Sequence, residues 1–246
     1  NPGATPINNM MITLKGRNAV ILAPHPRGEA TCAESVRIAR AELAKLGAPE
    51  DLVQFVSVAG ANKEAGKAIA AELLSQVDYS LVTAGPANVD MAYRVGTPSH
   101  GVGVGNAPVI IDETADLDIA IPKIVASKTF DHATSCSSEN SLVIDESVYD
   151  SVIVKLQEHG GWLVPAEKKQ QLEQAMWSNG NLNRQVVAQP ASRIAEVAGF
   201  DDEKAHASKF LIVEESEIGE QHPFSGEKLS VVLTVYRASD FDHALD

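Results

Sequence analysis

The sequence has few cysteines and a shortage of positive charge, and each scarcity excludes a class of protein. Its two cysteines, Cys32 and Cys136, cannot build a disulfide framework, which indicates a reducing, cytoplasmic compartment. Lysine and arginine number 20 against 33 aspartates and glutamates, a formal net charge of -13. Such a surface repels the phosphate backbone, so we expect no nucleic-acid partner. No run approaches the roughly 20 apolar residues that span a bilayer, so we expect no membrane partner either.

What remains has the proportions of a folded α/β protein. The 246 residues are 44% hydrophobic and 22% charged, which excludes disordered, collagenous and coiled-coil chains. Neither paired cysteines nor a His-Glu-x-x-His stretch is present, so we expect no metal site. The chain opens at Asn1 without a starter Met and stops at Asp246 inside a new helix, for which Ser239 is the expected cap. We therefore expect a fragment of a longer protein.

The first hundred residues alternate strand and helix patterns. Short apolar runs typical of buried strands lie at 19–23, 52–58 and 79–83. Apolar residues spaced by helical turns lie between them, and Thr31 with Glu34 predicts a capping box for the first helix, whose apolar stripe ends at Leu46. This βαβαβ order predicts a Rossmann-type parallel sheet covered by helices.

A helix is also predicted directly after the third strand. Pro86 suits its first position and Gly96 the position just past its end. A helix that begins beyond a strand's carboxyl end offers free N–H groups to an anion, and open α/β sheets bind nucleotides at that edge. An ordinary turn between strand and helix is the alternative.

A second α/β domain is predicted from about residue 105. Strands are expected at 108–112, 141–145, 209–213 and 229–236, and helices near 117–129, 147–159, 166–178 and 190–198. Pro122 falls inside the first of these helices, so that helix should start late or kink. The run Gly101–Asn106 lacks the third glycine of a dinucleotide fingerprint and precedes a strand. We interpret it as a crossover between domains 1–104 and 105–246.

The two cysteines differ in their sequence context. Cys32 lies in an apolar helical stripe, which predicts a buried, inert thiol. Cys136 lies among small polar residues, where a thiol can ionise and attack a carbonyl, although a loop cysteine without a function is the alternative. His132 is close in sequence, and we expect its side chain to be exposed rather than paired with this thiol.

Several short motifs occur in a fixed order along the whole chain. They are Asn1-Pro2, Pro24-His25-Pro26, Thr83-Ala84-Gly85-Pro86, Gly101 to Pro108, Lys128-Thr129-Phe130-Asp131, Cys136-Ser137-Ser138-Glu139 and Glu227-Lys228-Leu229-Ser230. With these motifs the chain resembles the aldehyde dehydrogenase superfamily, and more closely its CoA-acylating branch. That branch includes the acetaldehyde dehydrogenases and the aldehyde half of bifunctional aldehyde–alcohol dehydrogenases. The resemblance implies an NAD(P)-binding domain at 1–104 followed by a catalytic α/β domain at 105–246.

The resemblance assigns catalytic roles to two residues. Cys136 matches the family nucleophile, whose thiolate forms a thiohemiacetal with the aldehyde and then, after hydride transfer, a thioacyl-enzyme. Asn1 matches the asparagine whose amide, with the Cys136 backbone N–H, stabilises the oxyanion.

The resemblance also implies a set of cofactor-binding residues. Pro86 belongs to the helix start beside the pyrophosphate, and Glu227 matches the carboxylate that holds the nicotinamide ribose hydroxyls. His25 stands where hydrolytic members carry a lysine for the adenosine ribose, which leaves the choice of NAD or NADP open. The full set is His25, Pro26, Thr83, Gly85, Pro86, Gly103 and Glu227.

One departure from the hydrolytic enzymes favours CoA as co-substrate. Those enzymes carry a glutamate about 34 positions before the nucleophile to activate the deacylating water, and here that position is Val102. Glu139 is too close to Cys136 in sequence to be assumed as a replacement. We therefore expect a small aldehyde and CoA as reactants, in a homo-oligomeric protein. The alternatives are a hydrolytic aldehyde dehydrogenase with a displaced base and a non-catalytic nucleotide-binding protein.

The residues around the nucleophile carry a hint about the substrate. Thr134-Ser135 and Ser137-Ser138 place hydroxyls on both sides of Cys136. These hydroxyls could bind a polar aldehyde such as sulfoacetaldehyde rather than acetaldehyde. Bonding to the local backbone is the alternative role for them.

Overall fold

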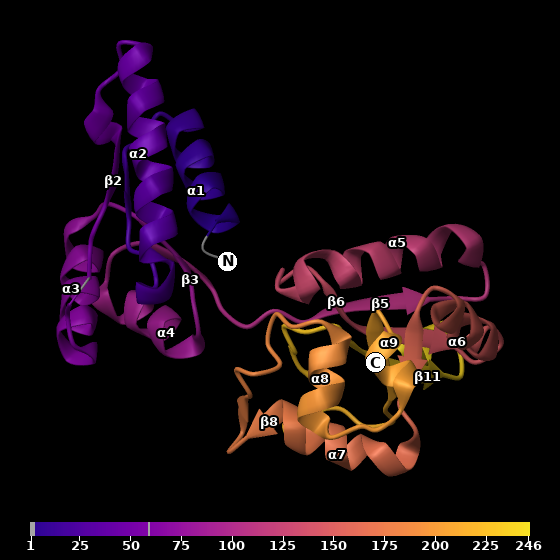
Figure 1. Cartoon of the computed structure of the whole chain (residues 1–246). Helices are drawn as coiled ribbons and strands as arrows, with labels where there is room; N and C mark the ends of the chain where they lie inside the picture. Colours follow the sequence, from indigo (N-terminus) through magenta and orange to yellow (C-terminus); the bar gives the residue numbers. More distant parts are fainter. Residues whose placement is uncertain (1–2, 59) are drawn as a thin grey trace. The chain divides into compact units, whose positions relative to one another are not determined.

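The computed structural model describes residues 3–58 and 60–246. The chain divides into two compact units, Asn1–Gly103 and Val104–Asp246 (Figure 1). Helices and strands alternate through both units, and all strand pairs except one short antiparallel hairpin are parallel, which confirms the predicted α/β class. Within the described part of the chain, no helix is both long and apolar enough to cross a membrane.

Unit 1 is built from two short pairs of parallel strands with helices beside them. β1 (Val20–Leu22) pairs with β2 (Val53–Phe55), and β3 (Ser80–Thr83) pairs with β4 (Ser99–Val102), as separate sheets. The sequence patterns missed β4 and the first helix. The helices of this unit are α1 (Ala4–Lys15), η1 (Pro26–Gly28), α2 (Glu29–Lys45), η2 (Glu50–Leu52), α3 (Lys63–Gln76) and α4 (Pro86–Val95).

The small core of unit 1 lies between α1, α2 and the first strand pair. Cys32 is completely buried there, as predicted, and packs in one cluster with Met10 and Val53. Leu46 is 82% exposed, so its assignment to the buried stripe was wrong. The reason is that α2 ends one residue earlier and the chain turns away.

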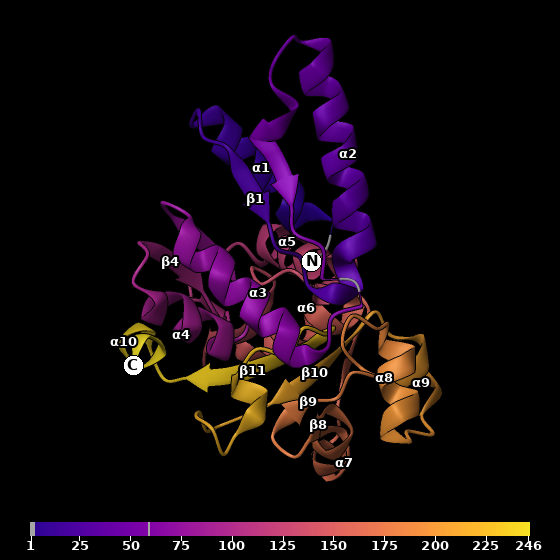
Figure 2. The same ribbon diagram turned by 90° about the vertical axis from the view of Figure 1, so that its left-hand side faces the viewer.

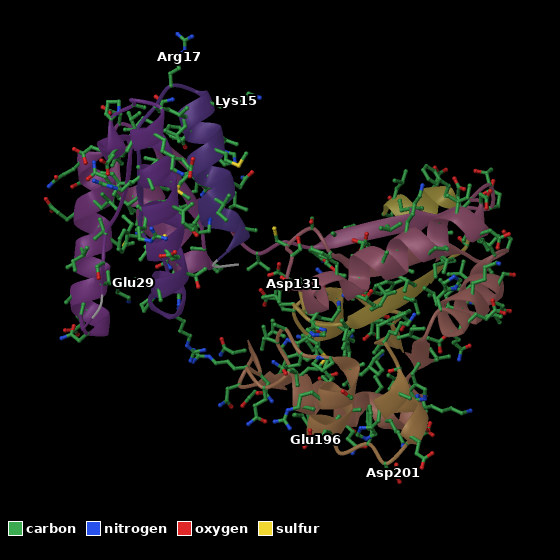
Figure 3. All side chains as sticks on the ribbon, turned by 45° about the horizontal axis from the view of Figure 1, so that its top comes forward. Lys15, Arg17, Glu29, Asp131, Glu196 and Asp201 are labelled. Carbon is green, nitrogen blue, oxygen red and sulfur yellow. The ribbon has the colours of Figure 1, made fainter. Side chains whose placement is uncertain are left out.

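The start of α2 also differs from the prediction. The turn η1 leads directly into α2, so Thr31 lies inside the helix and its capping box with Glu34 was wrong. Glu29 occupies the first turn instead (Figure 3), where a carboxylate is favoured by the helix dipole. It also accepts a hydrogen bond from the Val58 N–H, 3.1 Å away, and thereby ties the segment after β2 to the start of α2.

The helix after β3 has the predicted boundaries. Pro86 is its first residue, and Gly96 follows it with a φ of 91° in the left-handed region. Gly85 is the N-cap and no side chain caps the helix. The first turn of α4 therefore begins without a side-chain hydrogen-bond acceptor of its own.

Unit 2 contains a five-stranded, entirely parallel sheet. In space the strands follow the order β5-β6-β11-β10-β7, so the last strand of the sequence, β11, lies in the centre between β6 and β10. Each neighbouring pair is parallel. The strands are β5 (Ala107–Ile111), β6 (Glu139–Asp145), β7 (Gly161–Leu163), β10 (Phe210–Glu214) and β11 (Val232–Ala238).

Helices cover both faces of this sheet. In Figures 1 and 2, α5 and α6 lie on one side and α7, α8 and α9 on the other, as right-handed crossovers require. The remaining elements are a short hairpin, two 3-10 turns and a final helix. The bounds are α5 (Leu117–Thr129), η3 (Phe130–Ala133), α6 (Tyr149–Glu158), α7 (Ala166–Met176), β8 (Trp177–Ser178), β9 (Asn181–Leu182), α8 (Ala191–Ala198), α9 (Glu203–Ala207), η4 (Pro223–Ser225) and α10 (Phe241–Leu245).

Aspartates cap two helices of unit 2, and one of these caps differs from the prediction. α5 has the expected bounds and contains Pro122 without starting late; the Asp116 side chain caps it by accepting from the backbone N–H of Asp118 and of Ile119, at 3.1 and 3.2 Å. α10 is capped by Asp240, which accepts from the backbone N–H of His243 at 2.8 Å, and not by Ser239. In both helices an aspartate next to the first apolar residue provides the cap.

We predict that Gly161→Ala destabilises unit 2 by about 1–3 kcal/mol through overpacking. A Cβ at this position would lie 2.7 Å from Phe210 Cζ, 2.7 Å from Ile212 Cδ1 and 2.9 Å from the Leu156 carbonyl oxygen. The midpoint of urea unfolding measures the loss. Gly66→Ala is the control, since nothing lies within 4 Å of a Cβ there and alanine favours helix. Equal midpoints for both variants would contradict the close approach of β7 to β10.

Candidate functional site

The candidate site lies where three neighbouring strands of unit 2 begin. Gly105 precedes β5, Cys136 precedes β6 and Glu227 precedes β11. These strands are adjacent and parallel, so the segments that lead into them meet at the amino edge of the sheet. Open α/β sheets more often use the opposite, carboxyl edge. The strand order therefore brings together residues that are far apart in sequence.

Gly105 is the point of contact between the other two segments. A Cβ built on it would lie 3.0 Å from the Cys136 carbonyl oxygen, 3.5 Å from Cys136 Cβ and 3.2 Å from Glu227 Oε1. The Gly105 N–H donates a hydrogen bond to the Glu227 carboxylate. Glycine suits this position because a side chain would crowd both the thiol-bearing segment and the carboxylate.

The Cys136 side chain is exposed in a short turn, as predicted. The Ser138 N–H donates to the Ser135 carbonyl at 3.0 Å and closes the turn, and the hydroxyls of Ser135 and Ser137 are 2.9 Å apart. The Cys136 N–H donates to no described residue. The turn therefore presents both a thiol and a backbone donor to a ligand.

The segment before this turn has an unusual backbone. Asp131, His132 and Ala133 have φ values of 49°, 50° and 58°, so three successive residues other than glycine adopt the left-handed conformation. Figure 3 labels Asp131 in this segment. Its carbonyl and carboxylate oxygens both accept from the Thr134 hydroxyl at 2.8 Å. Each left-handed residue costs roughly 1 kcal/mol, and such strain is concentrated at functional sites. His132 is exposed, as expected.

Glu227 is a half-buried carboxylate whose pKa is set by burial and by one backbone N–H. Burial raises its pKa above the ordinary value, and the Gly105 N–H lowers it in part. Among the described residues no cation forms a salt bridge with it. A partly dehydrated acceptor without a counter-ion is suited to binding hydroxyl donors.

Polar side chains are also buried close to the Cys136 turn in sequence and in the neighbouring strand. Four side-chain oxygens have no hydrogen-bond partner within the described residues, and all belong to positions in or beside β6 and β11. Unpaired buried oxygens of this kind are rare in folded proteins and commonly mark functional regions or ordered water. They are Ser138 Oγ, Glu139 Oε2, Ser141 Oγ and Ser230 Oγ.

The remaining predicted site residues lie in unit 1 or outside the described residues. His25 and Pro26 are exposed directly after β1, and the His25 Nδ1 accepts from the Arg27 N–H at 3.2 Å. Thr83 ends β3 and is followed by the uncapped start of α4 at Gly85 and Pro86, an arrangement that can receive an anion.

Two predicted residues remain. Gly103 follows β4 with open space around it. Asn1 lies outside the described residues. Unit 2 thus brings Cys136 and Glu227 together, while the unit 1 residues follow strands of two separate sheets.

Sequence reasoning missed Gly105 as a site residue. The run Gly101–Asn106 was interpreted as a crossover and as part of a family motif, and of its glycines only Gly103 was assigned to the site. The signal available was that the last glycine directly precedes a strand, a position where two other segments can approach the backbone closely.

Comparison with known proteins identifies related sequences and structures. The model of the aldehyde dehydrogenase family matches residues 1–171. The acylating sulfoacetaldehyde dehydrogenase of Cupriavidus necator is 47% identical over 246 residues, covering 100% of this chain and 49% of that protein. The chain thus spans about half the length of that curated relative.

Solved structures agree with the sequence matches. The acetylating aldehyde dehydrogenase of Geobacillus thermoglucosidasius superposes with a TM-score of 0.90 at 36% identity, covering 99% of this chain and 53% of that one. The propionaldehyde dehydrogenase of Rhodopseudomonas palustris, crystallised with CoA and an acylated cysteine, gives a TM-score of 0.84 at 28% identity, covering 100% and 55%.

We predict that Glu227→Gln stabilises unit 2 at neutral pH. The raised pKa of Glu227 means that its contribution to stability is present at low pH and is lost as the pH rises through the folded-state pKa. Gln does not titrate and can still accept from the Gly105 N–H. The melting temperature of the variant should therefore exceed that of the wild type by more at pH 7 than at pH 4. A difference in melting temperature that becomes smaller as the pH rises would show that burial does not raise the pKa of this carboxylate.

Proposed function

This chain belongs to the aldehyde dehydrogenase family, and on that premise we propose that the protein containing it is an NAD(P)-dependent, CoA-acylating aldehyde dehydrogenase. The observation that carries the proposal is the exposed Cys136 thiol held beside the half-buried Glu227 carboxylate at Gly105. The proposed reaction is aldehyde, CoA and NAD(P)⁺ to acyl-CoA and NAD(P)H, and it is reversible. Two free cysteines suit a cytoplasmic location, and the family resemblance implies a homo-oligomer.

The residues of each unit fit a nicotinamide nucleotide. In unit 1 the uncapped α4 start at Gly85 and Pro86 offers N–H groups to phosphate. In unit 2 Glu227 has acceptor capacity beyond the Gly105 N–H and no counter-ion among the described residues, which suits the two hydroxyls of a ribose. We assign His25, Pro26 and Thr83, which follow or end β1 and β3, and Gly103 to the same set. When bound, the nucleotide supplies the hydride acceptor.

We propose that Cys136 performs the covalent chemistry. Its thiolate attacks the aldehyde carbon, a C–S bond forms, and the carbonyl oxygen becomes an oxyanion near the Cys136 N–H, which has no acceptor among the described residues. We assign Asn1 as the second oxyanion donor. Loss of hydride from the same carbon converts the adduct to a thioester. The CoA thiolate then attacks this thioester, the acyl group moves to CoA, and the Cys136 thiolate is released.

The acyl acceptor is proposed to be CoA rather than water. Val102, at the position of the hydrolytic base, has no proton acceptor in its side chain. A thiol ionises far more readily than water and needs no strong base to become a nucleophile. A relative whose crystal contains CoA and an acylated cysteine supports the same route.

The substrate is proposed to be a small aldehyde of the acetaldehyde or sulfoacetaldehyde type. Among the hydroxyls near Cys136, that of Thr134 is used by Asp131. The Ser135 and Ser137 hydroxyls bond to each other at the exposed turn, and one of their protons remains free for a ligand oxygen. The Cupriavidus relative, which is named for sulfoacetaldehyde, supports the polar substrate.

We expect Cys136→Ala to lower turnover on the order of a thousandfold or more while nucleotide binding persists, because the covalent step loses its nucleophile. The measurement is NAD(P)H formation and nucleotide affinity in the full-length product of the gene that encodes this chain. Cys32→Ala, which removes the buried thiol, is the matched control and should retain turnover. Normal turnover by the Cys136 variant would remove this residue from the mechanism.

We further expect the wild-type protein to form NAD(P)H from small aldehydes only when CoA is present. Acetaldehyde, propionaldehyde and sulfoacetaldehyde are compared at equal concentrations with and without CoA. Strong turnover without CoA would reject the acylating reaction and favour the hydrolytic alternative. Failure of nucleotide and aldehyde to react under either condition would favour the non-catalytic alternative.

A further inference from the structure

The residue that follows Glu227 is a completely buried lysine. Lys228 is 0% exposed, and its side chain turns back along its own chain. The Nζ donates to the Phe224 carbonyl oxygen at 2.7 Å and to the Gly226 carbonyl oxygen at 3.0 Å. The amine therefore closes the turn that delivers Glu227 to the site.

Two asparagines complete the attachment of this turn. Asn106 Nδ2 donates to the Ser225 carbonyl oxygen at 2.8 Å, and the Lys228 backbone N–H donates to Asn140 Oδ1 at 3.1 Å. Asn106 follows Gly105, and Asn140 lies four residues after Cys136. Three successive carbonyls, those of residues 224–226, are thus each bonded to a side chain.

These contacts fix the carboxylate from both directions along the chain. The turn before Glu227 is bonded to Asn106 in the segment that carries Gly105, and the residue after it is bonded to Asn140 in the strand that follows the nucleophile. The carboxylate itself accepts from the Gly105 N–H. Movement of Glu227 relative to Cys136 would require at least one of these bonds to break.

Stability alone does not account for an amine at this position. Burying an amine is costly, and burial lowers the pKa of Lys228 well below its ordinary value, as does the nearby Lys128. An apolar side chain of similar length would avoid that cost. What it could not do is donate to both carbonyls: that of Phe224 would keep only the Thr234 hydroxyl, 2.7 Å away, and that of the part-buried Gly226 would lose its donor among the described residues.

We propose that Lys228, with Asn106 and Asn140, forms a clamp that positions the Glu227 carboxylate for the hydroxyls of the nicotinamide ribose. The three are positioning residues that touch neither substrate nor cofactor. The proposal rests on the proposed function, in which Glu227 binds that ribose. It extends the binding site to residues that act only through the geometry of the turn.

The test is Lys228→Met in the full-length protein, with Lys128→Met as the matched control. Lys128 is 1% exposed, and its amine forms no hydrogen bond or close salt bridge with a described residue, although the charge of Glu139 raises its pKa. We expect Lys228→Met to raise the dissociation constant for NAD⁺ or NADP⁺ about tenfold, the effect of losing one or two hydrogen bonds. Lys128→Met should change it less than about twofold. Lys228→Gln, which keeps an amide donor, should recover part of the affinity.

Two measurements without nucleotide separate positioning from general damage. The rate of Cys136 alkylation by iodoacetamide should stay within about twofold of wild type in Lys228→Met, since the nucleophile turn makes its own bonds. Hydrogen exchange in peptides covering residues 103–107 and 223–228 should accelerate in this variant alone, because the turn loosens. Unchanged affinity together with unchanged exchange in Lys228→Met would overturn the clamp.

Folding failure and failure of the proposed function are distinguishable outcomes. Should Lys228→Met not fold, Asn106→Ala takes its place, because Asn106 is exposed and its loss frees only the Ser225 carbonyl. The same rise in dissociation constant and exchange is then expected, and its absence would overturn the clamp. If the wild-type protein binds neither nucleotide, the proposed function fails, and with it the ribose-positioning role, whatever the exchange rates show about the turn.

Discussion

Parallel pairing of β5, β6 and β11 is the constraint on which the candidate site depends. Ser141 of β6 lies opposite Pro108 of β5 on one side and Thr234 of β11 on the other. Because the three strands run in one direction, the segments before them emerge at the same edge of the sheet. That edge receives the thiol, the carboxylate and the glycine between them. If β11 occupied another place in the sheet, Glu227 would lie away from Cys136 even though the sequence of both segments stayed the same.

Local patterns predicted the elements well and the site only in part. The ends of α4, the burial of Cys32 and the exposure of Cys136 follow from turn chemistry and apolar spacing, which are local. The capping of α2 was missed because the preceding 3-10 turn runs directly into the helix, and nothing near Thr31 signals this. The proximity of Cys136 and Glu227 depends on strand order, which no spacing in the sequence reveals. The family resemblance implied their roles but not their contact through Gly105.

The amino edge of this sheet contains energetically unfavourable features, whereas the buried part of β10 contains none. The buried part of β10 is an apolar run, Phe210 to Val213, with no conflict between sequence and environment. At the site edge lie left-handed residues at 131–133, a half-buried carboxylate and hydroxyls without partners among the described residues. Local violations of this kind are expected where function, and not folding, selects the residue. Asn179 in the β8–β9 turn is also left-handed, but the concentration of such features at one edge is an argument for that edge that does not depend on the family match.

The same edge bears on the choice of acyl acceptor. Glu227 is the carboxylate in contact with the glycine that also touches Cys136, and one of its acceptor positions is already taken by the Gly105 N–H. If its remaining capacity holds ribose hydroxyls, as we propose, it cannot also accept a proton from water while the nucleotide stays bound. Glu139 has one carboxylate oxygen buried without a partner in the described residues, and it lies in the strand rather than in the exposed turn. Water would therefore react slowly with a thioester at Cys136. A thiol, which ionises without a strong base, would react faster and is the favoured acyl acceptor.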